Sequence, residues 1–169
     1  DADIFDMLRD TVRRFVNERL IPAEDAVEEA DAIPADIVSE IRTMGLFGLS
    51  VPEEFGGLGC TMSEESAIIR ELCRASIVYR SLIGTTVGIG SQGIVMDGTP
   101  EQKSEWLPKF ASGEAIASFA LTEPEAGSDA GSLRTTATRE GTIYRINGTK
   151  RYITNAPRAS MFTLMARTE

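Results

Sequence analysis

Two hydroxyl side chains and a glycine lie close together in one loop-like segment, and these residue types are well suited to hold a small ligand. In residues 119–129 an apolar run leads into Thr122, Pro124, Gly127 and Ser128. Such a loop can present backbone N–H groups and two hydroxyl donors to an anionic or heterocyclic ligand. The same residue types also form ordinary turns, in which the side chains bond the local backbone. Composition alone favours the ordinary turn.

Residue types that are absent or rare exclude several classes of catalysis. The 169 residues contain no histidine and only two cysteines, Cys60 and Cys73. Histidine-dependent nucleophilic catalysis, histidine-ligated zinc and histidine proton shuttles are therefore excluded within this sequence. Two isolated thiols make neither a disulfide framework nor a tetrahedral metal site, so we expect no metal and a reducing, intracellular setting. Acid–base chemistry has to come from carboxylates, lysine, tyrosine or a cofactor.

The charge balance argues against nucleic acid as a partner. There are 17 Lys and Arg residues against 26 Asp and Glu, which gives a formal net charge of −9. A nucleic-acid-binding protein needs a basic surface to meet phosphates. The longest uncharged stretch, residues 81–96, is too short and too rich in glycine and hydroxyl residues to span a membrane.

A second glycine-rich motif has a different explanation. Residues 88–93 read Gly-Ile-Gly-Ser-Gln-Gly and fit the dinucleotide-binding pattern G-x-G-x-x-G. That motif requires a strand before it and a helix after it. Here the glycines lie within an apolar, helix-like stretch. We therefore reject the dinucleotide interpretation and expect the small residues to permit close helix packing.

Helical patterns dominate the first two thirds of the sequence. We expect these helices to support the loop at residues 119–129. Apolar residues recur at helical spacing through residues 4–20, and Pro22 interrupts the pattern. A second helix is expected over residues 34–45, since proline suits a first turn and glycine a C-terminal cap. A further helix is expected to begin at Thr61, with a glutamate three positions on for a capping box, and another at Thr99.

The periodicity changes after Gly113, where β-branched and aromatic residues become common. Asn147-Gly148 lies between residues 144–146 and residues 150–153. This pair predicts a two-residue hairpin, because type I′ turns need positive φ at both positions. Glu140-Gly141 indicates another turn just before it.

These patterns together predict an α+β fold in more than one domain. An all-α helical bundle is expected at residues 1–113, followed by a truncated antiparallel β domain at residues 114–169. Residues 115–121 and 161–166 are expected to be strands of that β domain.

Five motifs in order along nearly the whole chain resemble the acyl-CoA dehydrogenase family. Residues 119–129 resemble the family signature, and residues 150–155, Lys-Arg-Tyr-Ile-Thr-Asn, resemble its second flavin-contacting motif. The other three motifs are Val-Pro-Glu-Glu-Phe-Gly-Gly-Leu-Gly at 51–59, Gly-Thr-Pro-Glu-Gln-Lys at 98–103 and Leu-Pro-Lys-Phe-Ala-Ser-Gly-Glu at 107–114. The resemblance implies an FAD-dependent oxidoreductase of fatty acid or amino acid catabolism, which removes two hydrogens across the α,β carbons of an acyl-CoA thioester.

The resemblance also implies which residues contact the flavin. These are Phe119, Leu121, Thr122, Gly127, Ser128, Tyr152, Ile153 and Thr154. Thr122 would hydrogen-bond the isoalloxazine ring, and Thr154 would place its hydroxyl near the reactive ring nitrogen. A donor there stabilises the negative charge that arrives with a hydride. Ser128 would lie where FAD and acyl-CoA approach each other, and so is implied in substrate binding as well.

The resemblance places the general base of the reaction outside this chain. In the family that base is a glutamate of a C-terminal helical domain, and no Asp or Glu of this sequence matches it by motif. We therefore expect no catalytic residue here, an absent C-terminal domain, and a chain that is inactive by itself. The family further implies an electron-transfer flavoprotein as acceptor, a homotetramer when complete, and a bacterial cytoplasm in preference to a mitochondrial matrix.

Substrate identity is left open by the sequence. Residues 78–81 resemble the segment with which glutaryl-CoA dehydrogenases hold a distal carboxylate through an arginine, here Arg80. Arginine can pair bidentately with a carboxylate. A surface ion pair with a helix carboxylate is the favoured explanation of Arg80, so a plain acyl-CoA is the main expectation and a glutaryl-CoA-type substrate the alternative. A non-catalytic assembly module of the same fold is a hypothesis of another class.

Overall fold

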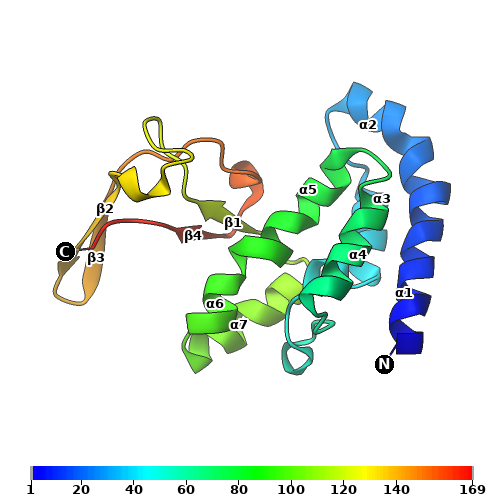
Figure 1. The fold of residues 1–169 in the computed structure, drawn as a ribbon, viewed down its shortest axis with the longest axis horizontal. Coiled ribbons are helices and arrows are strands. Elements are labelled where there is room, and N and C mark those ends of the chain that lie inside the picture. Colours follow the sequence, from blue (N-terminus) through cyan, green and yellow to red (C-terminus); the bar gives the residue numbers. More distant parts are fainter. Residues whose placement is uncertain (1, 169) are drawn as a thin grey trace.

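A computed structural model describes residues 2–168, with the helices gathered at one end and the strands at the other (Figure 1). In chain order the helices are α1 (Ala2–Phe15), α2 (Glu24–Ala30), α3 (Ala35–Thr43), α4 (Met62–Leu72), α5 (Ile77–Thr85), α6 (Gln92–Asp97) and α7 (Pro100–Ala111). The strands are β1 (Ala117–Ala120), β2 (Thr136–Glu140), β3 (Ile143–Asn147) and β4 (Met161–Leu164). The expected α+β fold class, helices first and strands after, is confirmed.

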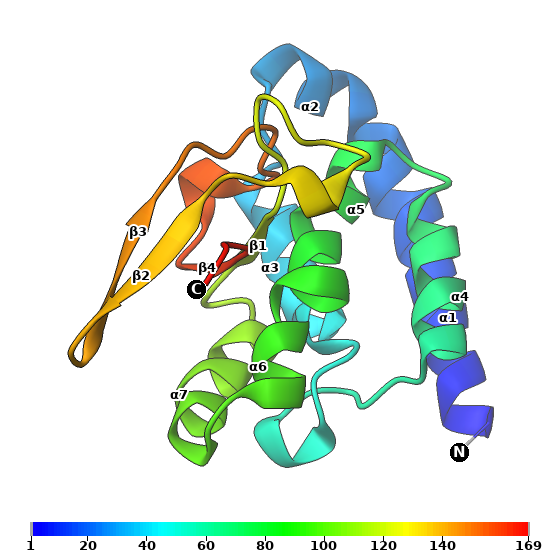
Figure 2. The same ribbon diagram turned by 60° about the vertical axis from the view of Figure 1, so that its left-hand side comes forward.

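Helices α1 to α5 pack around one apolar core, and α6 and α7 pack around a second, smaller one, because their apolar residues recur at helical spacing. α1 packs along α4, and the two lie side by side in both views (Figures 1 and 2). Tyr79 of α5 is fully buried in the larger core, and its hydroxyl donates a hydrogen bond of 3.0 Å to the Leu20 carbonyl oxygen. Each large apolar side chain buried in this way contributes about 1.5–3 kcal/mol to stability.

Local capping signals set the helix ends as the sequence predicts. At α4 the Thr61 hydroxyl accepts from the Glu64 N–H at 3.3 Å, and the Glu64 carboxylate accepts from the Thr61 N–H at 2.8 Å. Thr99 and Gln102 form the same reciprocal pair at the start of α7. Gly45 follows α3 with φ of +71°, the left-handed conformation that ends many helices.

Two helical stretches change their hydrogen-bond pattern without breaking. α1 continues through a π-helical turn and then a 3₁₀ turn, Ile21–Ala23, which contains Pro22 and leads into α2. α5 continues through a second π-helical turn, Thr86–Gly90, into α6. Residues 88–93 lie in this second stretch, and the described residues before Ala117 contain no strand. The rejection of a dinucleotide-binding motif is therefore confirmed.

The strands form two separate pairs. β2 and β3 are antiparallel, with Thr136 opposite Asn147, and Figure 2 shows this hairpin extending away from the helices. β1 and β4 are parallel, with Ala117 opposite Met161, a pairing that the sequence did not indicate. Because parallel partners need a long crossover, the whole segment between them, including the hairpin, forms the connection.

The hairpin predicted at Asn147-Gly148 is wrong. The chain reverses instead at Gly141, which has φ of +65°, as the neighbouring Glu140-Gly141 signal indicated. Asn147 is the last residue of β3, and residues 150–153 form no strand. Gly148 is needed for a close approach, because a Cβ there would lie 2.8 Å from the Cα of Thr135.

Hydroxyl groups connect the strands to the helices. The Thr86 hydroxyl accepts a hydrogen bond of 3.1 Å from the Ala117 N–H, at the start of β1. The Thr163 hydroxyl in β4 donates to the Gly90 carbonyl oxygen at 2.8 Å. The β1–β4 pair is therefore held against the π-helical turn that follows α5. Within residues 2–168 no helix has the length and apolar character needed to cross a bilayer.

Candidate functional site

The two segments that resemble flavin contacts lie side by side, although they are far apart in the sequence. The buried Ser118 hydroxyl donates to the Thr154 carbonyl oxygen at 2.7 Å, and the Arg151 N–H donates to the Thr122 carbonyl oxygen at 2.8 Å. The segment from Ser118 to Thr122 therefore runs opposite in direction to the segment from Arg151 to Thr154. β1 thus has β4 as one neighbour and residues 151–154 as another.

A buried carboxylate organises the loop that follows β1. Glu123 is 6% exposed, and its oxygens accept from the N–H groups of Arg134 and Thr135 at 2.6 and 2.9 Å and from Lys150 Nζ at 2.8 Å. Lys150 Nζ also donates to the Leu121 carbonyl oxygen at 2.9 Å. Hydrogen bonds from Lys150 and then Thr135 lower the pKa of Glu123 to about 2. This network connects three separate stretches of chain around the candidate site.

The three hydroxyl groups that the resemblance assigns to ligands are not used by the protein itself. Thr122 is half-buried, while Ser128 and Thr154 are exposed. Among residues 2–168 no hydrogen bond joins the hydroxyl of Thr122, Ser128 or Thr154 to another residue, although both Thr122 and Thr154 use their backbone carbonyls. These hydroxyls are donors available to a bound heterocycle, so the residues present fit a flavin.

Tyr152 holds an unusual backbone conformation beside these hydroxyls. Its φ is +57°, and its side chain is 79% exposed, with the Arg151 guanidinium 5.0 Å from the ring centroid. The left-handed region is unfavourable for a residue with a Cβ and occurs preferentially at functional sites. An exposed aromatic face of this kind suits packing against a planar ring system.

The other residues implied in flavin binding occupy the same part of the fold. Phe119 lies in β1, Leu121 follows it, and Ile153 lies between Tyr152 and Thr154; all three apolar side chains are half-buried. Gly127 is exposed, and a Cβ at this position would have no neighbour within 4 Å.

Arg80 lies away from these loops, on α5. It borders a cavity of about 410 Å³ between α4 and α5, together with Glu65, Ser66 and Ile69. No carboxylate oxygen within residues 2–168 lies within 4 Å of the Arg80 guanidinium, so the surface ion pair expected from the sequence does not form. Burial raises the pKa of Glu65, against the lowering effect of the Arg80 charge.

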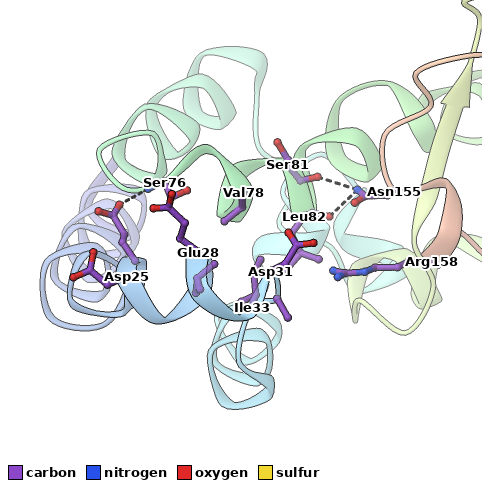
Figure 3. Close-up of a pocket in the computed structure, with 13 residues that line it drawn as sticks. Asp25, Glu28, Asp31, Ile33, Ser76, Val78, Ser81, Leu82, Asn155 and Arg158 are labelled. Atoms are coloured by element: carbon purple, nitrogen blue, oxygen red, sulfur yellow. Dashed lines mark hydrogen bonds between the residues drawn. The ribbon is translucent and has the colours of Figure 1, made fainter.

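A larger cavity, of about 630 Å³, lies between α2, α5 and residues 155–158 (Figure 3). Acidic side chains of α2 and Asp31 border one side of it, and Arg158 borders the other. Asn155 lies beside α5 at one edge of this cavity, and its Nδ2 donates to the Ser81 carbonyl oxygen at 2.9 Å. Within residues 2–168 no group of three His, Cys, Asp or Glu residues is arranged to hold a metal ion.

Sequence reasoning missed Ser118, Glu123, Lys150 and Asn155 as members of the site. Three of them lie inside motifs that carry the resemblance and Ser118 lies directly before one, but their contacts join segments that are distant in the chain. The sequence feature that could have indicated this contact is one acidic and one basic residue, Glu123 and Lys150, each next to an apolar stretch. Such charges are rarely buried unless they are paired.

Comparison with known proteins gives consistent matches along the whole chain. Residues 4–114 match the family model "Acyl-CoA dehydrogenase, N-terminal domain", and residues 118–169 match "Acyl-CoA dehydrogenase, middle domain". A (2S)-methylsuccinyl-CoA dehydrogenase of Cereibacter sphaeroides is 44% identical over 165 residues, which are 97% of this chain and 30% of that protein.

Two solved structures are similar over almost the full chain. A glutaryl-CoA dehydrogenase from Mycobacterium smegmatis, in complex with FADH2, superposes with a TM-score of 0.90 at 34% identity and covers 100% of this chain. A solved structure described as an electron transferring flavoprotein of Acidaminococcus fermentans has a TM-score of 0.88 at 30% identity and covers 98% of this chain. The match spans 43% of each of those two chains, so this chain corresponds to less than half of either.

Proposed function

The chain belongs to the acyl-CoA dehydrogenase family, and we propose that it binds FAD along residues 119–128 and 152–154 for the α,β-dehydrogenation of an acyl-CoA thioester. The observation that carries the proposal is the side-by-side arrangement of these two segments, with the hydroxyls of Thr122, Ser128 and Thr154 free of partners within residues 2–168. The similar glutaryl-CoA dehydrogenase structure, which holds FADH2, supports it.

Each residue of the proposed site has a separate task. A bound flavin supplies the two-electron acceptor that side chains lack. Thr122 and Thr154 would donate hydrogen bonds from their hydroxyls to acceptor atoms of its ring system, and so stabilise negative charge there. Tyr152 offers an aromatic face, and Ser128 donates toward the boundary with acyl-CoA. Glu123 and Lys150 hold the loop backbone in place before any ligand arrives.

We place the general base outside these 169 residues. Removal of the α-proton requires a carboxylate near the thioester, and the α-proton becomes acidic only when the carbonyl oxygen is hydrogen-bonded. Glu123 cannot serve, because its oxygens are occupied by Lys150, Thr135 and Arg134. The contribution proposed for this chain is therefore the binding and polarisation of the cofactor.

Anaerobic mixing of an acyl-CoA with the complete flavin-loaded protein, which supplies the general base that we place outside these 169 residues, tests the proposed function. The expected result is loss of the oxidised flavin absorbance together with formation of the 2-enoyl thioester. A protein that stays colourless in the presence of FAD would contradict the proposal and favour the hypothesis of a non-catalytic assembly module.

A dicarboxylic acyl-CoA is a second candidate substrate, favoured by Arg80. Its half-buried guanidinium faces the α4–α5 cavity without a carboxylate partner within residues 2–168. The methylsuccinyl and glutaryl groups in the names of two similar proteins each carry a second carboxylate. We expect Arg80→Gln to lower kcat/KM for glutaryl-CoA by about 100-fold, as for a lost charge-assisted hydrogen bond, and kcat/KM for butyryl-CoA by less than about threefold.

The partners of the complete protein follow from the same proposal. Reduced flavin needs an acceptor, and we propose an electron-transfer flavoprotein; the similar Acidaminococcus structure is described by that name. We further propose that the complete protein is a homotetramer. We place it in the bacterial cytoplasm, and the bacterial source of the relative from Cereibacter supports that location. Sedimentation of the purified protein tests the oligomeric state.

A further inference from the structure

Asn155 joins the strand region to the helical region at the edge of the proposed flavin site. Its Nδ2 donates to the carbonyl oxygens of Ser81 at 2.9 Å and Leu82 at 3.3 Å, both on α5 (Figure 3). Its backbone is left-handed, with φ of +64°, and it precedes the short 3₁₀ turn Ala156–Arg158. Asparagine tolerates this conformation better than most residues.

The change of helix type after α5 explains why a side chain is needed here. In a regular α-helix the Thr86 N–H would donate to the Leu82 carbonyl oxygen. It donates instead to the Ile83 oxygen, at the start of the π-helical turn Thr86–Gly90. The Leu82 carbonyl oxygen thus lacks its regular helical donor, the Thr86 N–H. Asn155 supplies a donor to it instead.

The residues next to this contact have roles in the proposed function, Thr154 toward the flavin and Arg80 toward a dicarboxylic substrate. Thr154 immediately precedes Asn155, and its carbonyl oxygen accepts from the buried Ser118 hydroxyl at 2.7 Å. Arg80 immediately precedes Ser81 on α5. Residues 154–155 are thus held from both sides, by β1 through Thr154 and by α5 through Asn155.

We propose that Asn155 is a positioning residue for the dehydrogenation, which sets the distance between Thr154 and α5, the helix that carries Arg80. This inference rests on the proposed function. Its physical basis is that hydride transfer requires donor and acceptor in contact geometry, and a misplacement of about 1 Å can cost about 100-fold in rate. Asn155 contributes alignment, while Thr154 contributes the hydrogen bond to the flavin.

Two substitutions separate the amide from the backbone conformation. Asn155→Gly keeps the left-handed backbone accessible and removes both hydrogen bonds. Asn155→Asp keeps the shape but replaces the donor by an acceptor-only carboxylate that faces two carbonyl oxygens. Asn147→Asp, at the exposed end of β3, is the matched control for the added charge.

The variants are made in the complete protein, and rapid mixing of each flavin-loaded form with acyl-CoA gives the main readout. We expect flavin reduction at least about tenfold slower in both Asn155 variants, with FAD and acyl-CoA dissociation constants within about threefold of wild type. The Asn147→Asp variant should match wild type. Equal reduction rates in wild type and Asn155→Gly would overturn the proposal.

A pH profile distinguishes positioning by a donor from a general loss of structure. A protonated aspartic acid regains an O–H donor, and the two facing carbonyl oxygens favour that form. The rate of Asn155→Asp divided by that of Asn155→Gly should therefore rise by at least about threefold between pH 7 and pH 5. A constant ratio would contradict a donor role.

Hydrogen exchange tests the contact independently of catalysis. The Asn155→Gly chain should exchange its amides at residues 81–86 faster than wild type, without flavin or substrate present. If the complete wild-type protein fails to reduce its flavin, the proposed function is wrong, and this exchange result alone decides whether Asn155 holds α5. Unchanged exchange would then show that it does not.

Discussion

Tyr79 in the helical region and Glu123 in the strand region are both buried, yet opposite kinds of surroundings hold them. Tyr79 lies among apolar side chains and uses one hydrogen bond to satisfy its hydroxyl. Glu123 is surrounded by donors, namely two backbone N–H groups, a threonine hydroxyl and an ammonium. Apolar burial thus dominates the helices, while a polar network orders the loops around the proposed flavin site.

The exposed surface shows the same difference. All five residues of β3 are exposed, and the side chains of Ile143, Tyr144 and Ile146 are each more than half exposed. The helical core, in contrast, contains many side chains that are fully buried. The strand region therefore depends on polar contacts between distant segments, and substitutions in the two regions should have different consequences.

The largest effect on stability is expected from the helical core. Phe47 is fully buried, and Phe47→Ala should lower the free energy of unfolding by about 4 kcal/mol, since it loses apolar burial and leaves a cavity. Ile143→Ala in the exposed hairpin is the matched control and should change it by less than about 0.5 kcal/mol. Urea denaturation measures both, and similar losses at the two positions would contradict the comparison.

The next largest effect concerns catalysis and should leave stability unchanged. Thr122→Val and Thr154→Val keep the shape of the side chain and remove its hydroxyl. Each should slow flavin reduction about 100-fold, as for the loss of one preorganised donor, and weaken acyl-CoA binding by less than about threefold. Ser128→Ala should instead weaken retention of FAD or acyl-CoA. Rapid-mixing kinetics that show unchanged reduction would remove the assigned roles of both threonines.

Gly148 provides a test of close packing in the strand region. Gly148→Ala should cost about 2 kcal/mol, because its Cβ would overlap Thr135, a partner of Glu123. Gly127→Ala is the control, since a Cβ there meets nothing within 4 Å and φ is not positive. Thermal unfolding of the two variants compares them directly. Equal midpoints would indicate that the loop around Thr135 adapts freely.

The hydrogen-bond network of Glu123 should affect both the affinity for FAD and the stability of the protein in acid. Glu123→Gln should weaken FAD binding about tenfold at pH 7, because Lys150 loses its anion. In the native protein the pKa of Glu123 is lowered to about 2, against about 4.3 in an unfolded chain. Its stabilisation is therefore complete above about pH 4.3 and is lost as the pH falls towards 2.

The Glu123→Gln variant should lack the loss of stability that protonation of Glu123 causes between about pH 4.3 and pH 2. Unfolding of wild type and Glu123→Gln, followed from pH 5 to pH 2, measures the difference between them. The difference should shrink as the pH falls, because protonation removes the charge that distinguishes the two side chains. A constant difference would contradict the role of the ionised carboxylate.

The smallest effect is expected at a helix cap. Thr99→Ala removes the side-chain acceptor at the start of α7 and should cost about 1 kcal/mol. Thr99→Ser, which keeps that acceptor, should cost less than half as much. Chemical denaturation resolves this difference, and equal losses would show that the capping bond contributes nothing.

Local features of the fold could be predicted from the sequence because neighbouring residues determine them. The Thr61 capping box and the glycine that follows α3 depend on residues within four positions of each other. The helical core followed from apolar spacing in the same way. The resemblance located the segments of the candidate site, and the structure places them side by side.

Features that depend on contacts between distant residues could not be predicted. Asn147-Gly148 has the composition of a hairpin turn, but its conformation follows from the packing of Gly148 against Thr135. The parallel pairing of β1 with β4, the Glu123–Lys150 contact and the Asn155 bonds to α5 each join segments separated by long stretches of chain. No local pattern indicates which of several distant segments will meet.

Hydrogen–deuterium exchange of the chain with and without FAD tests the central claim most directly. The claim predicts slower exchange on FAD addition at residues 119–128 and 152–154, with the cores of α1 and α4 unchanged. A Thr122→Val, Thr154→Val double variant should need a higher FAD concentration to reach the same protection. Protection confined to other segments, or no protection at saturating FAD, would contradict the assignment of this site.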